Sequence, residues 1–154
     1  MQREVRRKER EISEADAKEL LERGVYGVLS TVGADGAPYG VPLNYFVRGG
    51  AIYFHCAVEG HKLENLAAEP RVSFCVVGKT EVALEKFSTR YESVIVAGKA
   101  SEAVADEKQM ALEGLLAKYF PKKSEAERLK YIDDLGARTK AFRIDIEGIR
   151  GKRN

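Results

Sequence analysis

Three β-prone runs follow one another in the first part of the chain, and only short turns separate them. Asp35-Gly36 is a strong signal for a hairpin turn, and Gly49-Gly50 is typical of a second tight turn. Strands that short turns connect pair antiparallel, because a parallel neighbour needs a long crossover. Pro42 cannot donate to a ladder, so its strand is predicted to be an edge there or to be locally broken. The three runs are residues 25–32, 38–47 and 51–57.

The rest of the chain predicts four helices and three further strands. Ser13, followed by an acidic turn, is typical of a helix N-terminus, and Ser124 opens a capping box. The centre of the run 91–101 is apolar on both faces, which predicts cover on both sides. The polar segment 79–90 is interpreted as a long connection that reaches outward. The predicted helices are 14–23, 61–68 before Pro70, one capped by Asp106 and ending at Pro121, and one from Ser124 to near Gly136; the strands are 72–77, 91–101 and 139–149.

This order of elements indicates a mainly β fold with peripheral helices, in the form of a six-stranded antiparallel barrel rather than a doubly wound sheet. A length of 154 residues predicts a single domain, residues 1–154. Residues 1–12 are interpreted as a basic N-terminal arm, which is either solvated or touches a partner subunit or an anion. The basic residues of this arm are Arg3, Arg6, Arg7, Lys8 and Arg10, and Arg150, Lys152 and Arg153 at the other end are interpreted in the same way.

Charge and hydropathy exclude several classes of protein. The net charge of +2 is too small to indicate a nucleic-acid partner. No apolar run approaches the roughly 18–20 residues that span a bilayer. The first residues are charged and lack an apolar stretch, so no secretory signal is predicted, and we expect a cytoplasmic protein. Cys56 and Cys75 lie inside apolar strands and are expected to be reduced, buried thiols.

The segment 53–66 carries the clearest functional signal. It is predicted to be a buried strand that passes through a glycine turn into a helix, with His55 near the strand end. A helix N-terminus offers unpaired N–H groups and a partial positive charge. Gly60 would let a ligand approach the backbone, and Lys62 adds a full charge, so this junction is a plausible seat for a phosphate monoester.

Other interpretations of these residues stay open. His55 could be a structural histidine, and Lys62 could be a solvated surface lysine. A metal site is not favoured, because adjacent strand residues such as His55 and Cys56 point to opposite faces. The sequence contains no dinucleotide fingerprint, no P-loop and no nucleophile elbow. The lack of these motifs is compatible with a bound redox cofactor, because such a cofactor carries out the chemistry itself and the protein needs only to position it.

At these residues the chain resembles the FMN-binding split-barrel family related to pyridoxamine 5′-phosphate oxidase, and in particular its nitroimidazole-resistance branch. The likeness spans nearly the whole chain, and the order and spacing of the motifs make it specific. The motifs are 6–11 (RRKERE), 42–45 (PLNY), 53–57 (YFHCA), 59–63 (EGHKL), 70–74 (PRVSF), 90–98 (RYESVIVAG) and 143–146 (RIDI).

The resemblance implies a homodimer that binds FMN at the subunit interface. It implies that the strand from Val41 to Tyr45 follows the isoalloxazine ring, that His55 and Cys56 lie under the ring or ribityl chain, and that His61 and Lys62 hold the phosphate. Glu92 and Ser93 would come from the other subunit. The full set of expected cofactor-binding residues is Val41, Pro42, Leu43, Asn44, Tyr45, His55, Cys56, Ala57, Gly60, His61, Lys62, Glu92 and Ser93, with His55 as the catalytic residue.

The function that the resemblance implies is FMN-dependent reduction of small aromatic or nitro compounds. Pyridoxamine phosphate oxidation is not expected, because the oxidases use a flavin-packing tryptophan and this chain has no tryptophan. The alternatives are a flavin-binding sensor or carrier without turnover, and a related pocket that holds haem or a deazaflavin.

Overall fold

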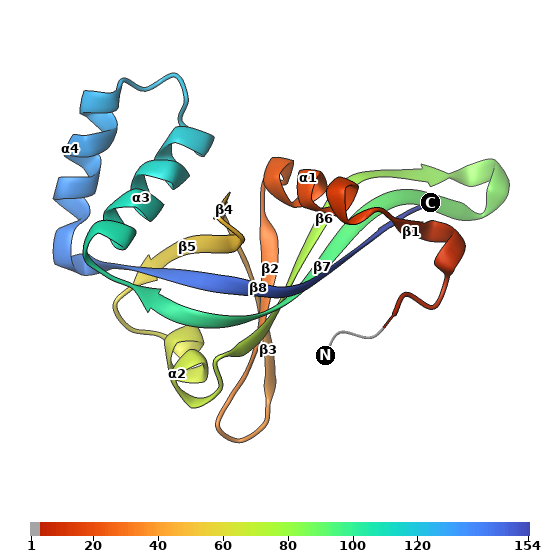
Figure 1. The fold of residues 1–154 in the computed structure, drawn as a ribbon, viewed down its shortest axis with the longest axis horizontal. Coiled ribbons are helices and arrows are strands. Elements are labelled where there is room, and N and C mark those ends of the chain that lie inside the picture. The colour runs from red at the N-terminus through yellow and green to blue at the C-terminus, as the bar shows by residue number, and fades with distance from the viewer. Residues whose placement is uncertain (1–3) are drawn as a thin grey trace.

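The structure, a computed structural model, describes residues 4–154, in which eight strands form one antiparallel sheet with four α-helices around it (Figure 1). The sheet order is β3-β2-β6-β7-β8-β5-β4, and β1 pairs with β8. The strands are β1 (Glu11–Ile12), β2 (Gly27–Val32), β3 (Pro38–Leu43), β4 (Phe46–Arg48), β5 (Ala51–Ala57), β6 (Arg71–Ala83), β7 (Ser88–Ala103) and β8 (Thr139–Arg153). The helices are α1 (Glu14–Arg23), α2 (His61–Ala68), α3 (Ala105–Tyr119) and α4 (Glu125–Leu135), with 3-10 turns η1 (Lys8–Arg10), η2 (Leu84–Lys86) and η3 (Gly136–Arg138).

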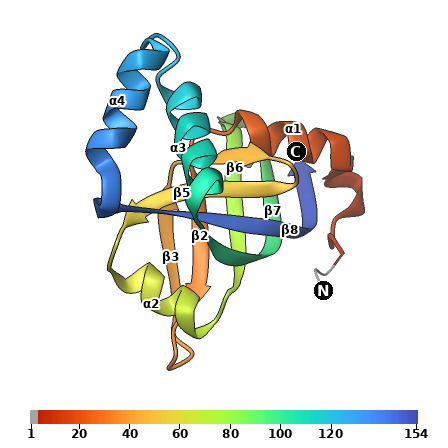
Figure 2. The ribbon, with the colours of Figure 1, turned by 60° about the vertical axis from the view of Figure 1, so that its left-hand side comes forward.

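The sheet curls into a split barrel, because β3 and β4 lie at opposite ends of the strand order but are joined by only Asn44 and Tyr45. The interior holds the main core, to which α1 contributes Leu20 and Leu21 and the strands contribute residues such as Phe54 and Phe74. A second, smaller cluster lies beneath α3. Figure 2 shows α3 crossing the outside of the sheet and α4 standing beside it. The predicted mainly β class and barrel are therefore confirmed.

The strand count differs from the predicted six because the run 38–47 is two strands. The chain leaves the ladder after Leu43, and β4 begins at Phe46. Pro42 lies in β3, an edge strand of the sheet order. Both predicted alternatives, an edge and a break, are thus present, and the break comes two residues after the proline. The short strand β1 is the other addition.

Side chains from distant elements satisfy the backbone at this break. The Tyr45 ring is fully buried, and its hydroxyl donates to the carbonyl oxygen of Leu21. The Tyr45 N–H donates to the Tyr119 hydroxyl at 3.0 Å, and Lys118 Nζ donates to the Tyr45 carbonyl at 3.1 Å. The Lys118 ammonium also lies 4.0 Å above the Tyr45 ring. These bonds replace the ladder partners that Tyr45 lacks, because buried backbone groups need partners.

The segment that was predicted to reach outward forms a projecting arm. β6 and β7 continue as a paired ribbon as far as Ala83 and Ser88, where η2 closes the hairpin. Figure 1 shows this arm on the opposite side of the molecule from α3 and α4. Phe87 at its tip is fully exposed.

Most predicted helix boundaries are confirmed, including α1, α2 and the capping box of α4 at Ser124. The predicted cap at Asp106 was wrong, because α3 begins at Ala105 and Val104 is its N-cap residue. The prediction that strand 91–101 is covered on both faces was also wrong within this chain. Val94 and Val96 are fully buried, but Ile95 between them is 47% exposed.

The described parts of both basic terminal segments are anchored to the barrel. Val5 is buried, and Glu11–Ile12 pairs with Gly151–Lys152 of β8. Arg150 pairs with Glu11 at 3.1 Å. Arg3 of the predicted arm lies outside the described residues. No helix among residues 4–154 is both long and apolar enough to cross a membrane.

The first prediction concerns the clamp at the strand break. Tyr45→Phe keeps the buried ring but leaves the Leu21 carbonyl without its donor, so the free energy of unfolding should fall by about 1–3 kcal/mol. Denaturant unfolding measures the change. Tyr131→Phe is the matched control, because that ring is exposed, and it should change stability by less than about 0.5 kcal/mol. Equal effects of the two changes would contradict the proposed importance of the clamp.

Candidate functional site

The candidate site is the junction between β5 and α2. Side chains alternate along β5 as the sequence predicts: Phe54 and Cys56 point into the core, whereas His55 and Ala57 are exposed. Tyr53 shares the His55 face, but it is buried. The open surface of the barrel therefore begins at His55.

The first turn of α2 presents free backbone donors. Its N-cap residue is Gly60, which has a φ of +135° and no side chain to cap the helix. The N–H groups of Leu63 and Glu64 bond to the Gly60 carbonyl, so the N–H groups of His61 and Lys62 are those without an intrahelical partner. No atom lies within 4 Å of the position that a Gly60 Cβ would occupy. This turn can thus accept an anion on its backbone.

A buried polar network holds α2 against β2 and β3. Asn65 is 3% exposed, and its Nδ2 donates to Thr31 Oγ1 at 2.9 Å. The Thr31 hydroxyl donates to the Tyr39 carbonyl at 3.4 Å. The Tyr39 ring packs against the His61 ring with centroids 4.2 Å apart. The sequence interpretation missed Tyr39 and Asn65; the polar Asn65 directly before the buried Leu66 was the available signal.

The charge of Lys62 acts on both side chains at the strand end. The His55 side chain reaches the surface, but its imidazole is partly desolvated by the groups around it, and this lowers its pKa. The positive charge of Lys62 lowers that pKa further. Burial also raises the pKa of the Cys56 thiol, which Lys62 partly opposes. At neutral pH the structure therefore holds a neutral imidazole and a protonated thiol beside a cationic lysine. A neutral imidazole can accept a hydrogen bond or a proton from a ligand.

The segment Val41–Tyr45 lies on the edge strand and the break that follows it. Val41 and Leu43 pack partly against the core, whereas Pro42 and Asn44 are exposed. Beyond β3 the sheet order has no further strand among the described residues, so the outer edge of β3 is accessible. The buried Tyr45 side chain does not reach this surface.

Glu92 and Ser93 are not brought to the junction within one chain. His55 lies across β8 from Ala103, because Ala141 pairs with both. Ser93 is ten residues from Ala103 along β7, a path of about 33 Å. The Glu92 carboxylate is also buried and bonded to Arg23 and Arg153. The junction thus gathers His55, Cys56, Ala57, Gly60, His61 and Lys62, and leaves the β7 pair far away.

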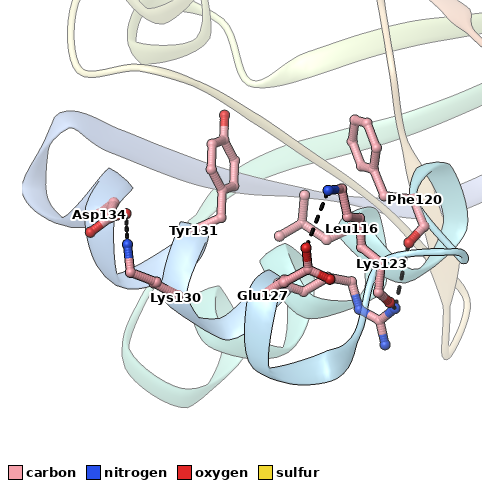
Figure 3. Close-up of a pocket in the computed structure, with 8 residues that line it drawn as sticks. Leu116, Phe120, Lys123, Glu127, Lys130, Tyr131 and Asp134 are labelled. Carbon is pink, nitrogen blue, oxygen red and sulfur yellow. Dashed lines mark hydrogen bonds and ion pairs between the residues drawn. The ribbon is translucent and has the colours of Figure 1, made fainter.

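A groove of about 480 Å³ lies elsewhere, between α3 and α4 (Figure 3). Leu116, Phe120 and Tyr131 give it an apolar surface, and none of the expected site residues lines it. Figure 3 shows ion pairs at its rim, between Lys123 and Glu127 and between Lys130 and Asp134. Within residues 4–154, no group of three or more His, Cys, Asp or Glu side chains could hold a metal ion.

Comparison with known proteins places this geometry in a family. A family model described as pyridoxamine 5′-phosphate oxidase matches residues 13–153. No curated protein matches the chain. A candidate 5-nitroimidazole antibiotic resistance protein of Bacteroides thetaiotaomicron has a similar structure (TM-score 0.75, 20% identity, covering 92% of this chain and 85% of that one).

Two further solved structures carry names that state a ligand. An FAD-binding protein of Mesorhizobium loti is 27% identical, with a TM-score of 0.66 over 94% of this chain and 97% of that one. The haem storage protein HutZ of Vibrio cholerae is 18% identical, with a TM-score of 0.66 over 88% of this chain and 92% of that one.

The second prediction concerns the titration of His55. Its pKa should lie below the ordinary 6.5, so its NMR titration should have a midpoint under that value. Because the unfolded chain then binds this proton more readily, stability should fall as the pH drops from 6.5 toward the folded pKa. Lys62→Gln should raise the midpoint only in part, since burial is the larger cause. Lys130→Gln should leave it unchanged, and a wild-type midpoint above 6.5 would contradict this account.

Proposed function

The chain belongs to the pyridoxamine 5′-phosphate oxidase family, and on this premise we propose that it is an FMN-binding oxidoreductase that reduces small aromatic or nitro compounds. The observation that carries the proposal is the open first turn of α2, where Gly60 and Lys62 stand beside His55. The FAD-binding relative supports a flavin, and the likeness to the nitroimidazole resistance protein motivates the substrate class.

The residues of the junction fit the phosphate of FMN. The free N–H groups of His61 and Lys62 and the Lys62 ammonium offer donors to a group that carries nearly two negative charges. Gly60 leaves room for the phosphate oxygens, because no atom surrounds its Cβ position. His61 would be kept at this seat by its contact with Tyr39.

The ring of the flavin would lie along the exposed edge of β3. Pro42 and Asn44 are exposed there, and edge-strand backbone groups can bond to a polar ring edge. When bound, the flavin would supply the electron transfer itself. His55 would position the substrate and hold or deliver a proton at a ring nitrogen, which its neutral form allows.

A homodimer would complete the site. Ser93 and Glu92 are too far along β7 to reach the junction of their own chain, so a second copy would have to bring Ser93 there. The central part of one sheet face is also suited to association, since its outward side chains over four strands carry no charge, and the charged Arg71 and Lys99 lie at the end of the same face. This uncharged face consists of Val28, Ser30, Val32, Pro38, Gly40, Pro42, Ser73, Cys75, Val77, Ser93, Ile95 and Ala97, as the strand register aligns them.

The buried Glu92 carboxylate changes how this residue would act in the dimer. Arg23 and Arg153 each form an ion pair with one of the two Glu92 carboxylate oxygens. The group that this region presents to the other subunit would therefore be a guanidinium rather than the carboxylate.

Haem is the second candidate ligand, because the exposed His55 and His61 could each supply an axial nitrogen and a haem storage protein shares the fold. A visible spectrum of the purified protein with added FMN or haem separates the two cofactors. A deazaflavin would use the same phosphate seat, and a carrier module would bind FMN without turnover.

The third prediction tests the phosphate seat and the role of His55. Lys62→Gln should weaken FMN binding by about 1–3 kcal/mol, because a charge-assisted contact is lost. His55→Gln should lower the rate of anaerobic nitroarene reduction more than it weakens FMN binding. Flavin fluorescence titration and single-turnover kinetics measure the two effects. The exposed Lys122→Gln is the control, and unchanged FMN affinity in Lys62→Gln would refute the seat.

The fourth prediction tests the uncharged face. Val77 is 53% exposed on it, and Val82 is 65% exposed on the arm. Val77→Lys should convert a dimer into monomers in light scattering, because a lysine would be buried without a partner. Val82→Lys should leave the dimer intact. A wild-type chain that is monomeric at micromolar concentration would contradict the dimer.

A further inference from the structure

The tip of the β6–β7 arm presents two large apolar side chains to solvent. Phe87 is fully exposed, and Leu84 is 81% exposed. Both belong to the turn at η2, which closes the hairpin at the far end of the arm (Figure 1). Apolar side chains that gather on a projecting tip bury nothing within their own chain, and such surfaces are typical of contact sites.

The backbone of Phe87 shows that the turn itself does not require this side chain. Its φ is +45°, in the left-handed region, which is unfavourable for a bulky residue. Glycine would adopt the same conformation without strain. The turn therefore carries an aromatic ring where its geometry favours glycine, and the ring is buried only if another molecule covers it.

The groove between α3 and α4 matches this tip in chemistry. Its apolar surface comes from Leu116, Phe120 and Tyr131, and its volume of about 480 Å³ leaves room for an aromatic ring. Figure 3 shows the Phe120 and Tyr131 rings on either side of Leu116. These two rings are 54% and 53% exposed, so the groove also lacks cover within its own chain. An aromatic ring placed between them would gain ring contacts on both sides.

The charges of the two surfaces are complementary as well. The two lysines at the rim of the groove are paired with carboxylates of α4. Arg128, which also lines the groove, donates to carbonyl oxygens and forms no ion pair within residues 4–154. Glu85 is exposed on the tip and is likewise without an ion pair among those residues. A tip that enters the groove can therefore bring a carboxylate to Arg128.

The tip cannot enter the groove of its own chain. Figure 1 shows the arm and the helix pair at opposite ends of the long axis, with β2 and β3 between them. These two strands belong to the uncharged face of the proposed dimer. In a two-fold dimer every contact occurs twice, with the roles of the copies exchanged. A second copy that is turned by half a rotation on this face can thus place each arm at the helix pair of the other copy.

We propose that the tip of each arm, through Phe87 and Leu84, docks into the α3–α4 groove of a second copy of this chain. The inference rests on the proposed function in one respect, which is the homodimer across the uncharged face. The stem of the arm, including Val82, stays outside the contact. The tip therefore adds affinity to this dimer and fixes the two copies in an antiparallel orientation.

Sedimentation of the full chain over a dilution series measures the contact. Phe87→Gly retains the turn, because glycine accepts its φ, and should raise the dimer dissociation constant about tenfold. Phe120→Ser in the groove should have the same effect. The double variant should be no weaker than either single variant, because both changes remove one contact. Val104→Ser is the matched control, since Val104 is 62% exposed away from the arm, the groove and the uncharged face, and it should leave the constant unchanged.

Disulfide cross-linking tests the orientation of the two copies. The variants are made in a Cys75→Ser background, because Cys75 lies on the uncharged face. Chains with Phe87→Cys, mixed with chains with Tyr131→Cys, should form linked pairs on mild oxidation. Neither variant should link to itself, because an antiparallel dimer keeps the two tips apart.

The other outcomes would overturn the proposal. Additive effects of Phe87→Gly and Phe120→Ser, or equal dimer affinity in Phe87→Gly and Val104→Ser, would show that tip and groove do not meet. Self-linking of Phe87→Cys chains would place the two arms against each other. Binding to phosphatidylglycerol vesicles that Phe87→Gly abolishes, with an unchanged dimer, would assign the tip to a lipid surface.

Failure of the proposed function gives a different result. A chain that binds no FMN would still show the coupled effects of Phe87→Gly and Phe120→Ser. A wild-type monomer would overturn the dimer itself, whereas a dimer that Phe87→Gly does not weaken would overturn only the docking of the arm.

Discussion

The fold depends on how Tyr45 is held where one strand becomes two. Its buried ring and its bonds to Leu21, Tyr119 and Lys118 turn the chain out of β3 and into β4. These two strands lie at opposite ends of the sheet order. Because only Asn44 and Tyr45 join them, the sheet has to curl until its ends are adjacent. The clamp thus converts a run of antiparallel hairpins into a barrel.

The same break leaves the barrel open where the candidate site lies. β4 pairs with only Ala51–Tyr53 of β5, so β5 has no neighbour on that edge from Phe54 onward among the described residues. The outer edge of β3 is also unpaired. Helix α2 contacts both of these edges. It follows β5 directly in the chain, and the ring of its first residue, His61, packs against the ring of Tyr39 in β3. Its free N–H groups, Lys62 and the neutral His55 therefore face a region that lacks strand cover.

Local signals in the sequence predicted the parts that depend on neighbouring residues. Capping at Ser13 and Ser124 and the proline after α2 gave correct helix boundaries, and alternation along β5 gave the orientation of His55. The clamp around Tyr45, the surroundings of Glu92 and the network around Asn65 were not predicted, because their partners are distant in the chain. Tyr119, for example, is 74 residues from Tyr45. The prediction that strand 91–101 is covered on both faces was wrong, because the sequence alone does not distinguish apolar residues on an outer sheet face from apolar residues in the core. The assignments of individual cofactor-binding residues remain predictions.

The central claim is that the β5–α2 junction binds FMN between two copies of the chain. Sedimentation velocity of the protein mixed with FMN, followed at the visible absorption of the flavin, tests it most directly. The account predicts that the flavin sediments with a species of two chains, in a ratio of one FMN to each chain. Flavin that stays behind as free FMN, or that sediments with a single chain, would contradict it.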